Sequence, residues 1–292
     1  MTEKALVLGG GGVTGVAWEL GVLAGLAEHD IDLSEADLVV GTSAGSVVGV
    51  DVRSGVSLAE LYQAQLAPPA EEIKAKISLM VVLRYARAMA FTKDPAVARA
   101  RIGAMALRVR TQPEASRRAI IESRIPIREW PAARLQITAV AAATGEFKVF
   151  DAASGVALID AVGASCAVPG VWPPVSIDGL RYIDGGMRSA TNADLAQGYQ
   201  RVVVIAPITK GFGSMTSLGS QVRTLTEQGS EVLVIKPDQA AVRAIGRNVL
   251  DPARREASAR AGYAQAAAEA PAIAALWSAA PADRPQTADR EQ

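Results

Sequence analysis

The sequence has few of the residues on which many catalytic and structural sites depend. Of its 292 residues, one is a cysteine, Cys166, and one is a histidine, His29. A single cysteine excludes an internal disulfide and a cysteine-rich metal site, and a single histidine excludes a histidine-based zinc site. We therefore expect no metal ion and no organic cofactor, and we interpret Cys166 as a small buried apolar residue.

The chain also lacks a net charge and a long apolar run. Its 30 basic and 30 acidic residues cancel, which argues against a nucleic-acid-binding protein with a broad basic field. No stretch reaches the roughly 20 apolar residues that cross a bilayer as a helix. The first residues show no basic segment that leads into an apolar one, so they do not predict a signal peptide. We expect a cytoplasmic protein, and the composition leaves its oligomeric state open.

Short apolar runs alternate with helix-like segments, which predicts a layered, mostly parallel α/β sheet flanked by helices. Half of the residues are hydrophobic and 4% are aromatic, so aliphatic side chains must fill the core. Strands are expected over 4–10, 36–43, 135–144, 146–152, 201–207 and 231–237, and a hairpin over 174–186. We predict one domain over 1–280 and a disordered tail over 281–292.

Residues 57–128 turn helical and show no clear strand, which predicts a helical insertion in this domain. Between 71 and 128 there are thirteen lysines and arginines against five acidic residues. Two interpretations stay open. The stretch is either an ordinary solvated basic face over a buried stripe, or a lid that makes peripheral contact with an anionic membrane surface.

A tight turn joins the second expected strand to a helix and carries a serine. Gly41-Thr42-Ser43-Ala44-Gly45 fits the G-x-S-x-G pattern in the strand-to-helix context that this motif requires. The glycines let the neighbouring backbone pass without a Cβ clash, and the helix N-terminus offers N–H groups to a developing oxyanion. We interpret Ser43 as a nucleophile; the alternative is a small-residue turn that only packs the helix on the sheet.

A nucleophilic serine needs a base, and His29 is in the wrong place to be one. It follows the first expected helix and precedes the strand that ends at Ser43, so about five residues of strand separate the two. A Ser-His-Asp triad is therefore not expected. We interpret His29 as an exposed loop residue or a helix cap.

A glycine-rich loop follows the first expected strand and opens the first helix. Residues 10–15 satisfy G-x-G-x-x-G, the pattern of dinucleotide-binding proteins. That function needs an acidic residue at the end of the second strand, where this chain has the Ser43 turn, and a P-loop needs a lysine after the glycines. The loop is better interpreted as a source of backbone N–H groups for an oxyanion beside Ser43, or as a turn that only permits close packing.

Asp184 ends the second strand of the expected hairpin and is followed by Gly185 and Gly186. Without a suitable histidine, a carboxylate is the next candidate base. An exposed aspartate, with a pKa of ~3.9, is a weak base, but burial and a direct contact with a serine hydroxyl would strengthen it. Because Asp-Gly-Gly is also a common turn, this interpretation depends on the other two motifs.

In their order along the chain, these three motifs resemble those of the patatin-like phospholipase family. The resemblance covers roughly residues 4–210 and extends to the segments 164–169 and 172–175 and to Asn192. It implies a patatin-like fold and a lipid acyl hydrolase with a Ser43–Asp184 dyad that acts on lipid or other acyl esters. It also implies an oxyanion hole formed by Gly10, Gly11 and Gly12. The glycines that would support the motifs are Gly15, Gly41, Gly45, Gly185 and Gly186.

One position departs from the family pattern. Thr14 stands where the family usually has arginine or lysine, so a positive charge beside the glycine loop is missing. The backbone donors remain, and we expect activity without the family's usual preference for anionic head groups. Two other functions stay open: an acyltransferase or thioesterase that uses the same acyl-enzyme, and a catalytically silent lipid-binding module. A dinucleotide-binding oxidoreductase is a weaker alternative.

Overall fold

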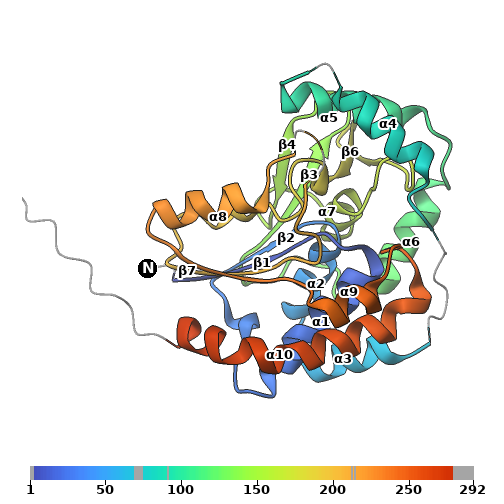
Figure 1. Ribbon diagram of the computed structural model, residues 1–292. Coiled ribbons are helices and arrows are strands. Elements are labelled where there is room, and N and C mark those ends of the chain that lie inside the picture. Colours follow the sequence, from blue (N-terminus) through green and yellow to red (C-terminus); the bar gives the residue numbers. More distant parts are fainter. Residues whose placement is uncertain (1–2, 69–74, 91, 212, 214, 279–292) are drawn as a thin grey trace, which may run out of the picture.

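Most strands of the sheet run parallel, and the two motif-bearing turns follow the first two of them. The computed structural model describes residues 3–68, 75–90, 92–211, 213 and 215–278, in which eight strands form one mixed sheet (Figure 1). The parallel strands are β1 (Lys4–Leu8), β2 (Leu38–Gly41), β3 (Leu135–Ala141), β7 (Arg201–Ile205) and β8 (Glu231–Ile235). The antiparallel strands are β4 (Phe147–Phe150), β5 (Val175–Ile177) and β6 (Leu180–Asp184). The order is β5-β6-β3-β2-β1-β7-β8, with β4 also on β3, and it confirms the expected mostly parallel sheet.

Helices lie on both faces of the sheet. They are α1 (Gly12–Ala27), α2 (Ala44–Val52), α3 (Leu58–Leu66), α4 (Leu79–Met89), α5 (Pro95–Arg108), α6 (Glu114–Arg124), α7 (Leu158–Ser165), α8 (Leu218–Glu227), α9 (Gln239–Ile245) and α10 (Arg255–Trp277). Figure 1 shows α1, α2 and α10 on one face and α8 on the other. Among the described residues, no helix is long and apolar enough to cross a bilayer, and no three His, Cys, Asp or Glu side chains group as metal ligands.

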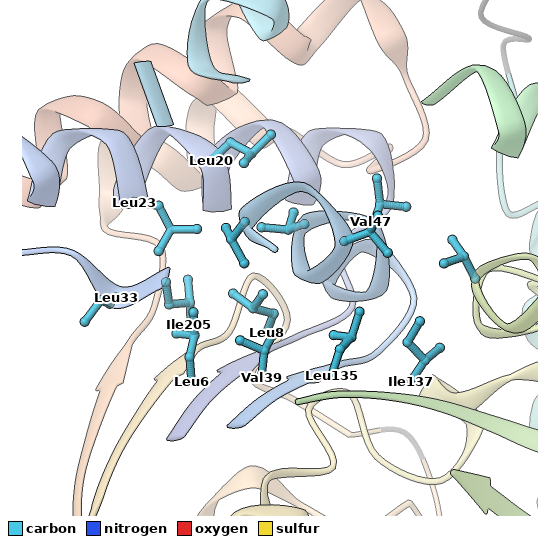
Figure 2. Packing of buried hydrophobic residues seen from close by; sticks show 14 of the residues in the cluster. Leu6, Leu8, Leu20, Leu23, Leu33, Val39, Val47, Leu135, Ile137 and Ile205 are labelled. Atoms are coloured by element: carbon cyan, nitrogen blue, oxygen red, sulfur yellow. The ribbon is translucent and has the colours of Figure 1, made fainter. Parts of the chain in front are cut away.

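The core forms because strand side chains alternate between the two faces. Leu6 and Leu8 of β1 belong to the cluster that includes α1 and α2, whereas Ala5 and Val7 belong to the cluster that includes α8. In Figure 2, Leu23 of α1 lies above Leu6 of the sheet. Both faces are covered, which explains why the β1 and β2 sequences are continuous apolar runs.

The register of β3 brings two strand ends together. Ile137 pairs with Gly41 of β2 and with Phe150 of β4, so β2 and β4 lie on opposite edges of β3. Ala139 pairs with Asp184 of β6 and also with β4, so β6 shares the edge of β2. Because β2 is parallel and β6 antiparallel to β3, their carboxyl ends meet head-on along that edge.

The stretch predicted as a helical insertion divides into two parts. Between 57 and 128, every described secondary-structure element is a helix. However, α3 packs on α1 and α10, with Tyr62 stacked on Tyr263 at 4.8 Å, so it belongs to the main helix layer. Helices α4 and α5 pack together at the other end of the molecule, near β3 and β6 (Figure 1). The tail predicted over 281–292 lies outside the described residues.

Candidate active site

Ser43 lies in a strained turn between β2 and α2. Its backbone has φ 52° and ψ −115°, a conformation that costs a non-glycine residue on the order of 1–3 kcal/mol. The turn depends on the flanking glycines, because a Cβ at Gly45 would collide with the carbonyl of Leu8, and one at Gly41 would lie 2.5 Å from the carbonyl of Gly45. The expected strand-to-helix turn is confirmed, and it presents Ser43 at the carboxyl end of the sheet.

Asp184 reaches Ser43 where the two strand ends meet. The Ser43 hydroxyl donates to Asp184 Oδ2 at 2.7 Å, although 141 positions separate the two residues in the sequence. Asp184 Oδ1 accepts the Gly186 N–H at 2.7 Å, which fixes the orientation of the carboxyl group. A Cβ at Gly185 would lie 2.5 Å from the carbonyl of Thr138, so this turn also requires glycine. The structure therefore brings together the serine and the aspartate that the sequence singled out.

The environment of Asp184 changes its proton affinity. Only 3% of the residue's surface is exposed. Burial raises the pKa of Asp184 to about 7, while the hydrogen bonds from Ser43 and Gly186 oppose that rise. A carboxyl that titrates near neutral pH is matched to general base catalysis.

His29 is exposed in the turn that follows α1, as predicted.

The glycine loop lies directly beside Ser43, and a Cβ built on Gly10 would be 3.6 Å from the Ser43 Cβ. The Gly10 N–H donates to the carbonyl of Ala190 at 2.7 Å and is therefore already engaged. Within the described part of the chain, no group accepts a hydrogen bond from the N–H of Gly11 or Gly12, and both glycines line the cavity at Ser43. The structure thus leaves two of the three expected donors available.

A buried acid supports the glycine loop from beneath. Glu19 Oε1 accepts the Gly9 N–H at 2.9 Å, and the same N–H lies 3.0 Å from the carbonyl of Ile205. Burial of Glu19 raises its pKa well above the ordinary value, which favours the neutral carboxyl. The Gly15 N–H donates to the carbonyl of Gly11 at 2.8 Å in the first turn of α1. The loop is therefore held in one conformation by the strands and by the helix that it opens.

Two side chains for which no role was predicted from the sequence hold the site in place. The Ser165 hydroxyl accepts the Ser43 N–H at 2.9 Å. Asn192 is fully buried and donates to the Thr42 hydroxyl and to the carbonyl of Ser189, each at 3.0 Å. These contacts tie the end of β2 to α7 and to the segment after β6. Both residues lie in stretches that the family resemblance covers, but only the fold shows what they contact.

Cys166 contacts the Ser43 turn and, like Ser43, lines the cavity. Its thiol donates to the carbonyl of Ser43 at 3.3 Å. Burial, together with the nearby Asp184 carboxyl, raises the pKa of the Cys166 thiol to about 11. A protonated, buried thiol is a poor nucleophile. Cys166 is thus the small buried residue that the sequence predicted.

Ser43 and Asp184 open onto a largely apolar cavity of about 270 Å³. Besides the glycine loop and the dyad, its walls include Val13, Val16, Val47, Tyr85, Met89, Trp172, Met187, Ile208 and Leu250. Tyr85 and Met89 come from α4, so the insertion forms part of the wall. A largely apolar cavity of this kind can enclose an apolar chain.

A second, more polar cavity of about 430 Å³ adjoins the first. The two share lining from Val13, Val16, Val47 and Arg124. The second cavity adds Asp51, Gln65, Ser123 and Arg255. Burial raises the pKa of Asp51 to about 8. The site therefore has an apolar compartment and, next to it, a less apolar one with charged side chains.

Position 14 carries no charge, but cationic side chains from other elements line the cavity. Thr14 is fully buried, and its hydroxyl donates to the carbonyl of Val249 at 3.2 Å. The cationic side chains that line the first cavity are Arg117, Arg124 and Lys210. The Arg117 guanidinium lies 4.0 Å from the centre of the Trp172 ring. Helix α6 and the segment after β7 therefore bring positive charge to the cavity.

The family comparison covers both members of the dyad and the glycine loop. The sequence profile described as patatin-like phospholipase matches residues 6–196, which include Ser43 and Asp184. The chain belongs to the patatin-like phospholipase family. This membership confirms the resemblance found in the sequence and supports a lipid acyl hydrolase in general terms. A search of curated proteins gave no match.

Some solved structures resemble this patatin-like chain at low sequence identity. VipD from Legionella pneumophila is 12% identical with a TM-score of 0.46, over 94% of this chain and 67% of that one. The type III effector ExoU is 17% identical with a TM-score of 0.37, over 92% and 53% of the two chains. ExoU in complex with SpcU, from Pseudomonas aeruginosa, is 16% identical with a TM-score of 0.34, over 89% and 52%. This chain thus spans about half of the ExoU chains that it matches.

Proposed function

We propose that this protein hydrolyses acyl esters of lipids, with Ser43 as the nucleophile and Asp184 as the general base. The observation that supports this most strongly is the 2.7 Å hydrogen bond from the Ser43 hydroxyl to Asp184 Oδ2. The strained turn at Ser43 and the raised pKa of Asp184 are both expected of a nucleophile and its base. The apolar cavity beside them has the character that an acyl chain requires.

In the first half of the reaction, Ser43 Oγ attacks the ester carbonyl carbon and its proton passes to Asp184. The N–H groups of Gly11 and Gly12, at the N-terminus of α1, stabilise the oxyanion of the tetrahedral intermediate. Gly10 serves as an anchor of this loop through Ala190. When the intermediate collapses, the bond from the carbonyl carbon to the alcohol oxygen breaks and Asp184 returns the proton to that oxygen.

In the second half, water attacks the carbonyl carbon of the acyl-enzyme while Asp184 accepts its proton. The bond to Ser43 Oγ then breaks, the proton goes to Ser43, and the fatty acid leaves. One carboxyl thus acts in turn as base and acid, for which a pKa near the working pH is favourable. An acyltransferase would follow the same path with an alcohol in place of water.

The test is hydrolysis of short and long acyl esters by the wild type, Ser43→Ala and Asp184→Asn. Each substitution removes one member of a unit, so we expect kcat/KM to fall roughly a thousandfold or more in both. Asp178→Asn is the matched control, because Asp178 is exposed at the turn of the same hairpin and should keep the wild-type rate. Wild-type rates in Ser43→Ala or Asp184→Asn would exclude the dyad.

Product analysis distinguishes the remaining functions. Free fatty acid as the main product in the presence of an alcohol acceptor supports a hydrolase, whereas acylated alcohol supports a transferase. If the wild type cleaves no ester yet binds lipid, the chain is a silent lipid-binding module.

A further inference from the structure

Helix α4 exposes apolar side chains that an ordinary surface helix would bury. Its outer residues Leu79, Met80 and Leu83 are 73%, 58% and 55% exposed, and Val82 is also exposed. Only Val81 and Tyr85 of this helix are buried. The composition of the stretch left open whether it is a solvated basic face over a buried stripe. Val81 and Tyr85 do form a buried stripe, as that interpretation expects, but the solvent-facing side of α4 carries apolar side chains as well as basic ones.

The inner side of the same helix forms part of the catalytic cavity. Tyr85 and Met89 line the cavity at Ser43. The Tyr85 hydroxyl donates to the carbonyl of Pro169 at 2.7 Å. Pro169 follows the segment that contains Ser165, which accepts the Ser43 N–H. A surface that binds the outer side of α4 would therefore lie against a helix that forms part of the cavity wall.

Positive charge borders the exposed apolar residues. A cavity of about 720 Å³ between α4 and α5 is lined by Arg84 and Arg87 of α4 and by Arg101 and Arg108 of α5. Its other lining residues are uncharged. Figure 1 shows α4 and α5 at the outer corner of the molecule, on the opposite side from α10. The apolar ridge and the arginines form one surface, which we call the α4 face: Leu79, Met80, Val82, Leu83, Arg84, Arg87, Arg101 and Arg108.

We infer that the α4 face docks on an anionic lipid bilayer and so presents the catalytic cavity to the membrane. The exposed leucines and methionine can enter the headgroup boundary, while arginine side chains extend their charge to lipid phosphates. The docking does not depend on catalysis; only the delivery of substrate to Ser43 rests on the proposed function. An acidic protein is the alternative partner, and the experiment separates the two.

The experiment measures co-sedimentation of the full chain with vesicles of phosphatidylcholine, alone or with phosphatidylglycerol, at low and high salt. We expect binding to the anionic vesicles that weakens at high salt. Arg84→Gln/Arg87→Gln should lower partitioning at low salt by roughly tenfold or more, since each cation near an anionic surface contributes about 1 kcal/mol. Leu79→Ser/Leu83→Ser should lower it by a similar factor, because it removes apolar area from the interface.

Matched control substitutions on other surfaces show whether vesicle binding depends on the α4 face itself. Val242→Ser removes a 57% exposed apolar side chain on α9, and Arg223→Gln/Arg243→Gln removes two exposed arginines on α8 and α9. Both should bind within about twofold of the wild type, because the attraction of a bilayer acts near the docking face. Circular dichroism and the thermal midpoint show that each variant is folded.

Three results would overturn the inference: no binding of the wild type to anionic vesicles, equal binding to neutral vesicles at all salt concentrations, or wild-type binding by both α4 variants. The absence of binding to anionic vesicles would instead favour an acidic protein as the partner of the α4 face. Ser43→Ala should bind vesicles like the wild type. If Ser43→Ala hydrolyses esters normally but the α4 variants lose vesicle binding, the proposed function fails and the docking stands.

Discussion

The Ser43–Asp184 pair and the α4 face differ in what determines their position. The dyad is held by the register of β2 and β6 on β3 and by buried hydrogen bonds to Ser43 and Asp184. Helix α4 is attached by a few side chains, among them Tyr85, and turns apolar residues to the solvent. Burial and hydrogen bonds thus fix the geometry of the dyad, whereas the outer side of α4 leaves apolar side chains exposed for the partner proposed above.

The turn that carries Ser43 should not tolerate even one added methyl group. In Gly45→Ala, the new Cβ would collide with the carbonyl of Leu8, a backbone atom that cannot move without shifting β1. We expect the free energy of unfolding, measured with denaturant, to fall by about 3 kcal/mol. Gly219→Ala in α8 is the control, because its Cβ would meet open space. The control should be neutral or stabilised by up to about 1 kcal/mol, and equal losses in both would contradict the account.

The pH profile tests the buried environment of Asp184. As the proposed general base, Asp184 must be deprotonated to accept a proton, and burial raises its pKa to about 7. We therefore expect kcat/KM for a neutral, water-soluble ester to fall about tenfold per pH unit below 7 and to level off above it. A profile that is flat from pH 5 to 8 would indicate an ordinary carboxyl and contradict the assigned role.

Ser165 tests the support behind the nucleophile. Ser165→Ala removes the acceptor of the Ser43 N–H while leaving the dyad contact itself intact. We expect kcat to fall roughly tenfold with little change in KM, because an unpaired buried N–H costs about 1–3 kcal/mol and the strained turn relaxes. Ser258→Ala, at a buried serine of α10, is the control and should leave kcat unchanged. A change in KM alone would indicate a role in substrate binding instead.

The smallest effect on the free energy of unfolding is expected for substitutions on the outer side of α4. Leu83→Ser should change the free energy of unfolding by less than about 0.5 kcal/mol, because that side chain is 55% exposed. By comparison, Leu23→Ala in the core should cost about 2–5 kcal/mol. Denaturant unfolding of both variants measures the contrast. A large decrease in the free energy of unfolding of Leu83→Ser would mean that Leu83 stabilises the fold and is not kept exposed for a partner.

The sequence was informative where local chemistry fixes the structure. Apolar runs that end in glycine turns predicted β1 and β2, and Asp178-Gly179 predicted the β5–β6 hairpin. The misplaced histidine made Asp184 a candidate base, but its pairing with Ser43 depended on the combination of motifs and on the family resemblance, because the contact rests on a register between distant strands. The engagement of Gly10 with Ala190, the contact of Ser165 with Ser43 and the outward turn of α4 depend on tertiary packing that no local pattern specifies.

The most direct measurement of the central claim is the intact mass of the protein after reaction with a fluorophosphonate at pH 8. This reagent phosphonylates an activated serine: the serine oxygen bonds to phosphorus and fluoride is released. The account predicts one adduct per chain, located on Ser43, absent in Ser43→Ala and formed much more slowly in Asp184→Asn. An adduct on another residue, or equal labelling of the wild type and Asp184→Asn, would contradict it.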